Sequence, residues 1–172
     1  VKEVDEFVRR SEARQLQAPT QFKYTGRIVS FDINDRWAAD LIDFTAQPSG
    51  KKEEWKYILV CQDIFSRKLM AKALKQNDSG YVADKFADII RENGKCKELN
   101  TDAGGEFSGK PFVDLLRREK IAHRVKNKLD VNDISTVDRA ISSLKKALAR
   151  TGSMSTWEER LGKVVAGENK LG

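Results

Sequence analysis

The segment Arg36-Trp-Ala-Ala-Asp-Leu-Ile-Asp-Phe44 has the residue pattern of one β-strand. Its two expected faces carry Trp37, Ala39 and Leu41 on one side, and Asp40 and Ile42 on the other. A carboxylate between apolar neighbours in a predicted central strand is seldom a simple solvated residue. Asp40 is therefore the first candidate for a functional residue. Asp43 is a rival ligand in the same segment, but its side chain is expected on the opposite face.

Turn and capping residues divide the rest of the chain into further elements. After a turn at residues 47–52, strands at 56–62 and 68–73 are expected to continue from the first strand as an antiparallel meander. Asn77-Asp-Ser-Gly80 is typical of a helix start, and Gly94 of the residue that ends a helix. The remaining expected elements are a strand at 97–101, a helix opened by Pro111, a strand at 122–125, a helix at 136–150 and a final helix at 156–165.

This order predicts an α/β protein in which helices pack on both faces of a mixed five-stranded sheet. It resembles the order of the ribonuclease H-like fold. The first and fourth strands are neighbours in that fold, which would bring Asp40 close to Asp102. We expect residues 1–30 to form an extension or linker, and residues 31–172 to form the domain.

Two further carboxylates complete a candidate set. Asp102 lies at the end of the strand expected at 97–101, and 35 residues separate it from Asp138. Each has a structural alternative. The residues after Asp102 are turn-like, so its side chain could simply stabilise a turn. Asp138 follows Ser135 at the spacing of a capping box, so it could simply cap a helix, and judged alone that interpretation is slightly favoured.

Three converging carboxylates would suit divalent metal ions, because Mg²⁺ prefers oxygen ligands and accepts only a few carboxylates. Carboxylates from two strand ends and a helix start could hold two such ions, which would activate an attacking oxygen and stabilise a leaving one. Without metal the three charges repel one another, so at least one pKa should be raised. Glu106 is expected to be a solvated loop residue, and His123 to be structural.

Composition narrows the remaining possibilities. The net charge of +6 fits a polyanionic partner such as nucleic acid, although 26 acidic residues make this a weak indication. Two cysteines and one histidine exclude a disulfide framework and a zinc site with two histidines and two cysteines. No apolar run is long enough to suggest a membrane span. Because the chain starts at Val1, we expect it to be part of a longer protein.

Basic residues in two segments are candidates for contacts with DNA phosphates. Some lie in the polar stretch after the strand at 122–125, and the others on the helix expected at 136–150, one side of which also carries Asp138. The candidates are Lys126, Lys128, Lys145, Lys146 and Arg150. The alternative is a solvated cationic face, which the dipole at a helix C-terminus favours in any case.

Several motifs together resemble the catalytic cores of retroviral-type integrases and DDE transposases. Residues 28–43 resemble the family's first motif, Asn100-Thr-Asp-Ala-Gly-Gly-Glu-Phe107 its Thr-Asp-x-Gly-x-Glu-Phe motif, and residues 127–146 its closing loop and helix. The pattern is most similar to the integrases of Polinton/Maverick-type elements and their viral relatives. The family usually has glutamate as its third acid, whereas this chain has Asp138.

The resemblance implies a metal-dependent polynucleotidyl transferase with catalytic and metal-binding residues Asp40, Asp102 and Asp138. Its expected reactions are 3′-end processing and strand transfer of element DNA into target DNA, with Mg²⁺ or Mn²⁺ as cofactor. It also implies a nuclear location, with packaging in a virus-like particle as an alternative, and a homodimer or higher oligomer. Trp157, Leu161 and Val164 are the expected dimer contacts. The alternatives are a ribonuclease H-like nuclease and a non-catalytic, integrase-derived DNA-binding or interaction domain.

Overall fold

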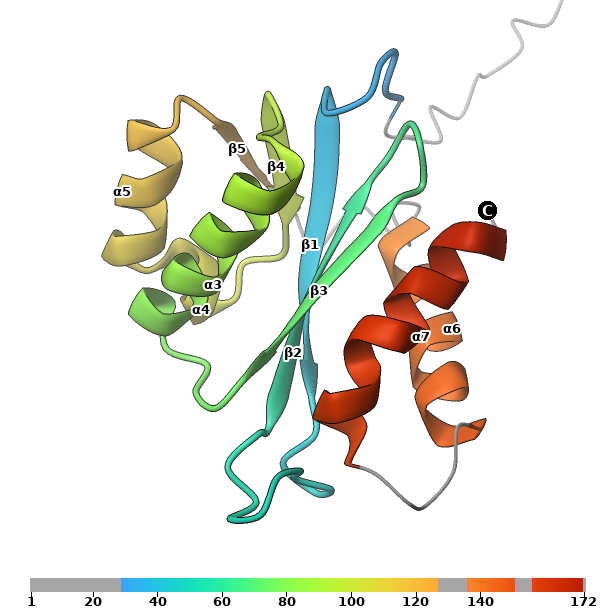
Figure 1. Ribbon diagram of the computed structural model, residues 1–172. Helices are drawn as coiled ribbons and strands as arrows, with labels where there is room; N and C mark the ends of the chain where they lie inside the picture. The colour runs from blue at the N-terminus through green and yellow to red at the C-terminus, as the bar shows by residue number, and fades with distance from the viewer. Residues whose placement is uncertain (1–28, 127–135, 151–155, 172) are drawn as a thin grey trace, which may run out of the picture.

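The computed structural model describes residues 29–126, 136–150 and 156–171. Their strands form a five-stranded sheet in the order β3-β2-β1-β4-β5. The strands are β1 (Arg36–Asp43), β2 (Tyr57–Asp63), β3 (Leu69–Leu74), β4 (Glu98–Thr101) and β5 (Ala122–Val125). The helices are α3 (Ser79–Asn93), α4 (Gly105–Ser108), α5 (Lys110–Arg118), α6 (Thr136–Arg150) and α7 (Trp157–Leu171). Helices α3, α4 and α5 cover one face of the sheet, and α6 and α7 cover the other (Figure 1).

The predicted α/β architecture is confirmed, including the mixed sheet and the antiparallel meander. Strand β1 pairs antiparallel with β2, and β2 pairs antiparallel with β3. On its other side β1 pairs in parallel with β4, and β4 pairs in parallel with β5. Because β1 and β4 run in the same direction, their carboxyl ends reach the same edge of the sheet. This edge is where Asp40 and Asp102 were expected to meet.

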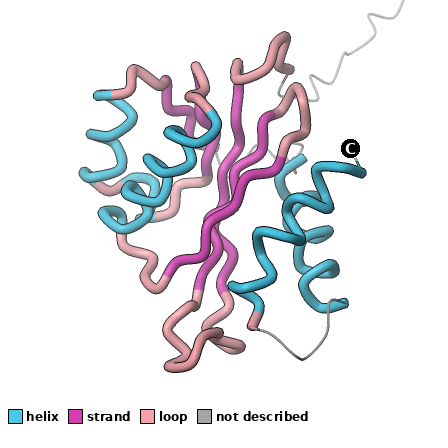
Figure 2. Tube along the Cα trace, in the orientation of Figure 1, coloured by secondary structure: helices cyan, strands magenta, loops and turns pink. Residues whose placement is uncertain are grey.

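Alternation along the strands builds a separate core on each face. Trp37 and Ala39 belong to the core under α3 and α5, together with Leu59, Leu99 and Phe86. On the opposite face Ala38 and Ile42 pack with Ile58, Val60, Leu144 and Trp157. The two faces predicted for the first strand are therefore confirmed. The helices lie in two groups that sandwich the strands (Figure 2).

Helix α7 corrects one expectation, because its apolar residues are not a dimer surface. Trp157, Leu161 and Val164 are 8%, 5% and 7% exposed and pack into the core beneath α6 and α7. Helix α7 covers the edge strand β3 on this face of the sheet. The helix also runs to Leu171, well past the expected end at residue 165. Near the end of α7, Asn169 Oδ1 accepts from Leu69 N at 2.7 Å and Asn169 Nδ2 donates to Leu69 O at 2.9 Å. These bonds give hydrogen-bond partners to both main-chain polar groups of Leu69 on the edge strand β3.

Local capping explains where the other helices begin and end. Asp78 accepts a hydrogen bond from Tyr81 N at 3.0 Å at the start of α3, and Gly94 ends that helix with φ of 81°, a conformation that favours glycine. The residues after Asp102, expected as a turn, include the short helix α4. The side chain of Phe107 on α4 is fully buried, and this tertiary contact favours a helical turn over an open one.

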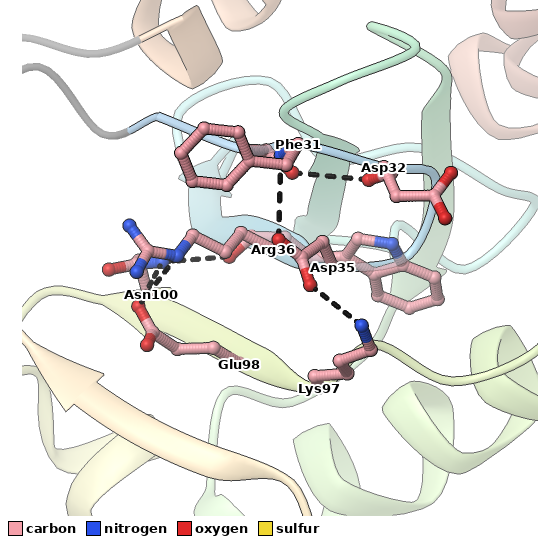
Figure 3. Close-up of polar contacts among 9 residues, drawn as sticks. Phe31, Asp32, Asp35, Arg36, Lys97, Glu98 and Asn100 are labelled. Carbon is pink, nitrogen blue, oxygen red and sulfur yellow. Dashed lines mark hydrogen bonds and ion pairs between the residues drawn. The ribbon is translucent and has the colours of Figure 1, made fainter.

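Polar contacts tie the segment before β1 to the start of β4 (Figure 3). Asp35 Oδ2 accepts from Phe31 N at 3.4 Å, and Asp35 Oδ1 lies 3.0 Å from Lys97 Nζ. Arg36 and Glu98 form a second ion pair at 3.5 Å, in register on neighbouring strands. Ion pairs that remain accessible to solvent contribute little stability, so main-chain pairing and the two cores set the register of β1 on β4.

The domain limits at residues 30 and 31 stay a prediction, because nearly all of the expected extension lies outside the described residues. Among the helices that the structure does describe, none combines the length and the apolar character needed to cross a membrane.

Candidate acidic site

Asp40 occupies the central strand and is half-buried on the face covered by α6. Its Oδ1 accepts a hydrogen bond from Leu41 N at 2.8 Å. Burial raises the pKa of the Asp40 carboxyl group above its usual value of 3.8, and the negative charges of Asp102 and Asp138 raise it further. The hydrogen bond from Leu41 and the charge of Lys126 act in the opposite direction. Asp40 therefore experiences the charge of both other acids predicted for the site.

Asp102 lies just past the end of β4, in a position that matches Asp40 on β1. Ala38 pairs with Asn100 across these parallel strands, and each candidate acid follows its paired residue by two positions. The side chains of Asp40 and Asp102 are therefore expected on the same face of the sheet. Asp102 Oδ1 accepts from Gly104 N at 3.0 Å, so the side chain also stabilises the turn that begins α4. Asp102 thus makes the turn contact that was the structural alternative, and its charge also raises the pKa of Asp40.

Asp138 reaches the same region from a helix instead of a strand. It is exposed in the first turn of α6, where a negative charge is favourable to the helix dipole. Helix α6 is held against the sheet by Val137, Leu144 and Leu148, which are buried on the Asp40 face. Ser135, the partner in the expected capping box, lies outside the described residues, so the capping interpretation stays untested.

The donor chemistry of these three residues fits divalent cations. All three side chains offer carboxylate oxygens, and their mutual repulsion at Asp40 is what a bound cation would relieve. In the described part of the chain, no group of three or more His, Cys, Asp or Glu residues is close enough to hold one ion. Mg²⁺ is commonly bound by one or two carboxylates together with water or phosphate oxygens.

The rival residues have other local roles. Asp43 is exposed, and its Oδ1 accepts from Thr45 N at 2.7 Å, which lowers the pKa of its carboxyl group. Glu106 was expected in a loop, but it lies in the first turn of α4. His123 lies on β5, with its Nε2 2.8 Å from Thr101 Oγ1. This last contact was not expected from the sequence, because the two residues are on different strands.

The candidate DNA contacts fall into two places. Lys126 follows β5, and its charge acts on Asp40. Lys145 lines a groove of about 630 Å³ between the end of β1 and helices α6 and α7, with Phe44, Trp157 and Arg160. Lys146 and Arg150 are exposed on α6, and Lys128 lies outside the described residues.

Arg160 in this groove was missed by sequence reasoning. Its guanidinium donates to Leu148 O at 3.1 Å and to Thr156 O at 3.3 Å, which fixes a positive charge near the end of α6. Phe44 and Trp157 stack beside it with ring centroids 5.1 Å apart. No local pattern predicts this grouping, because its members come from three separate elements.

Residues 33–130 match the family model described as the integrase core domain. The match covers more than half of the chain and includes both strand-borne acids, while Asp138 lies beyond it. The chain therefore belongs to the integrase core domain family. Its fold is the ribonuclease H-like fold of retroviral-type integrase catalytic cores.

Curated relatives come from a transposon and from a retrovirus. The chain is 32% identical over 95 residues to an uncharacterized transposon-derived protein of Caenorhabditis elegans, a match that covers 55% of this chain and 32% of the relative. It is 29% identical over 117 residues to the Gag-Pro-Pol polyprotein of squirrel monkey retrovirus, which covers 68% of this chain and 6% of the polyprotein. The chain thus corresponds to a minor part of each relative.

Solved structures agree on the fold. The catalytic core domain of BIV integrase superposes with a TM-score of 0.63 at 20% identity, covering 77% of this chain and 81% of that one. The HTLV-2 integrase catalytic core in complex with magnesium, in a trimeric form, gives 0.61 at 20% identity and covers 77% and 82%. A chain of the simian T-cell lymphotropic virus intasome in complex with a PP2A regulatory subunit gives 0.64 at 20% identity and covers 77% and 47%.

Proposed function

We propose that this chain is the catalytic core of a DNA integrase that performs metal-dependent phosphoryl transfer, both 3′-end processing and strand transfer. One observation carries the proposal. The pKa of Asp40, a half-buried carboxyl on the central strand, is raised by burial and by the charges of Asp102 and Asp138. Like charges that act on a half-buried carboxyl group do not stabilise a fold, so the effect of Asp102 and Asp138 on Asp40 supports a cationic ligand at this place.

Asp40, Asp102 and Asp138 are the residues that would hold the metal, which we take to be two Mg²⁺ or Mn²⁺ ions when DNA is bound. Bound divalent ions supply Lewis acidity to an attacking and a leaving oxygen. The task of the protein is to hold its carboxylates at one edge of the sheet. The parallel pairing of β1 with β4 and the packing of α6 on the Asp40 face of the sheet support this role.

An aspartate in the third position makes a specific demand on α6. The families that this chain resembles usually have glutamate there, and the aspartate side chain is one methylene shorter. The helix would therefore have to lie about 1 Å closer to the metal, because one carbon extends a side chain by that distance. Val137 is next to Asp138 and is buried against the sheet, which keeps the first described turn of α6 close to β1.

Lys126 and Lys145 are the residues that we propose contact DNA phosphates nearest to the acids. The positive charge of Lys126 lowers the pKa of Asp40, and Lys145 lies two turns along α6 from Asp138. The net charge of +6 supports a polyanionic substrate. The same proposal implies a nuclear site of action and assembly into a homodimer or higher oligomer.

A branched oligonucleotide that mimics an integration product tests the proposed reaction, because an isolated core is expected at most to reverse strand transfer. We expect Mn²⁺-dependent resolution of this substrate by the wild type, and none by Asp40→Asn. Asp84→Asn is the matched control, since Asp84 is an exposed carboxylate on α3, on the other side of the sheet. Equal activity of Asp40→Asn and the control would contradict the proposal.

The same samples separate the alternative functions. A ribonuclease H-like nuclease would cleave an RNA–DNA hybrid and leave the branched DNA intact. A non-catalytic DNA-binding domain would retain the branched DNA in a mobility-shift experiment without any metal-dependent change in strand length.

A further inference from the structure

The single histidine of the chain contacts the strand end that carries Asp102. His123 Nε2 lies 2.8 Å from Thr101 Oγ1, and Thr101 Oγ1 donates to the carbonyl oxygen of Asp102 at 2.8 Å. Because the hydroxyl proton is used in that second bond, the hydroxyl accepts from the ring, so the imidazole carries its proton on Nε2. A chain of two hydrogen bonds therefore leads from β5 to the main chain of Asp102.

The strand end is also held through the main chain. Lys126 N donates to Thr101 O at 2.8 Å, so both oxygens of Thr101 take hydrogen bonds from residues on or just after β5. Thr101 is fully buried, so these bonds replace contacts with water that it has lost. The orientation of the last residue of β4 is thus fixed from the neighbouring strand.

The ring of His123 is itself constrained by packing. It lies edge-on to Phe112 of α5, with ring centroids 6.2 Å apart. Burial lowers the pKa of His123 below its usual value of 6.5, so the ring is neutral at pH 7. Leu99, the β4 partner of His123 in the register, is fully buried on the same core face. The imidazole therefore lies on the face opposite to the expected side of the Asp102 carboxylate.

We propose that His123 is a positioning residue that acts through Thr101 to hold the Asp102 carboxylate level with Asp40, so that both can reach the same divalent cation. The inference rests on the proposed function, because it requires Asp102 to bind metal. Residues that orient a metal ligand without touching the metal typically change its affinity by about tenfold to a hundredfold when they are replaced. His123 and Thr101 would act in this way through the main chain, since Thr101 Oγ1 donates to the carbonyl oxygen of Asp102.

The unique histidine provides a readout that does not depend on activity. With ¹⁵N-labelled wild-type protein, NMR should find the Nε2–H tautomer, and saturating Mg²⁺ should shift the His123 ring signals. Asp84→Asn should give the same shift, because Asp84 is an exposed residue of α3, whereas the network joins β4, β5 and α5. Ring signals that do not move while Mg²⁺ binds would overturn the inference.

Variants of Thr101 separate positioning from simple packing. Thr101→Val keeps the shape but removes the hydroxyl, and we expect Mn²⁺ affinity measured by calorimetry to fall about tenfold or more. Thr101→Ser keeps the hydroxyl and should restore affinity to near that of the wild type, even if it melts at a lower temperature. An unchanged affinity in folded Thr101→Val, or the same affinity loss in both variants, would show that the hydroxyl does not act on the metal site.

Asp102→Asn distinguishes failure of this inference from failure of the proposed function. If Asp102→Asn binds Mn²⁺ as well as the wild type, Asp102 is not a ligand and the proposed function fails together with the inference. If Asp102→Asn loses binding but Thr101→Val and His123→Phe do not, only the positioning role is wrong.

Discussion

The three acids of the candidate site are held in two different ways. Asp40 and Asp102 belong to neighbouring parallel strands, where main-chain hydrogen bonds fix the register and alternation fixes the face. Asp138 belongs to α6, which meets the sheet only through side chains such as Val137 and Leu144. The family match covers residues 33–130, which include the strand-borne pair and not Asp138. The strand-borne pair is thus set by backbone geometry, and the helix-borne acid by core packing.

This difference indicates where variation is tolerated. A residue placed by strand register cannot move without disturbing its neighbours, whereas a helix can slide or tilt by a fraction of an ångström when its buried residues change. A shorter third acid is compatible with such an arrangement, because a small shift of α6 restores its reach.

The largest effect is expected from Asp138→Asn. If the helix-borne acid is an equal partner, resolution of the branched DNA should fall on the order of a thousandfold or more, as for Asp40→Asn, because residues that act as a unit fail together. Asp138→Glu should retain activity within about tenfold of the wild type, which corresponds to a change of roughly 1.4 kcal/mol in the activation free energy. A near wild-type rate for Asp138→Asn, with only a small drop in melting temperature, would instead identify a helix cap.

Leu144→Ala tests whether packing positions the third acid. Leu144 is fully buried between α6 and the sheet, so its truncation should lower the free energy of unfolding by about 2–5 kcal/mol in urea denaturation. Activity of the protein that remains folded should fall as well, because α6 loses its anchor. Full activity per folded molecule would show that Asp138 does not depend on this contact.

Much of the fold and of the candidate site could be predicted from the sequence. The bounds of β5 and α6 and the face of Asp40 follow from local alternation and helical spacing, which depend on neighbouring residues alone. The burial of α7 could not be predicted, because the same apolar stripe suits either a core or a dimer. It is settled by distant contacts such as the 3.0 Å hydrogen bond from Trp157 Nε1 to Gln47 O.

Lys145→Gln should have a smaller effect, confined to DNA affinity. Removing one phosphate contact should weaken binding of duplex DNA by about 1 kcal/mol and reduce the slope of log affinity against log salt by about one. The control is Lys163→Gln, which removes an equal charge from an exposed position on α7 outside the groove. Equal losses in both variants would mean that net charge, and not the groove, determines binding.

The smallest effect concerns the pH dependence of stability without metal. The folded-state pKa of Asp40 is raised, mainly by burial, so the folded protein holds this proton more tightly than the unfolded chain does. Its contribution to the free energy of unfolding is present below the unfolded value of 3.8 and is lost as the pH rises through the folded pKa. Urea denaturation between about pH 4 and pH 7 should therefore show a shallower decline for Asp40→Asn than for the wild type. Parallel curves would argue against the shift.

Calorimetric titration of Mn²⁺ is the most direct test of whether the strand-borne pair and the helix-borne acid form one site. The wild type and Asp84→Asn should bind equally well, Asp40→Asn should lose binding, and Asp138→Asn should bind at least about tenfold more weakly. If Asp138→Asn binds Mn²⁺ as tightly as the wild type while Asp40→Asn does not, Asp138 is not part of the metal site and the account is wrong.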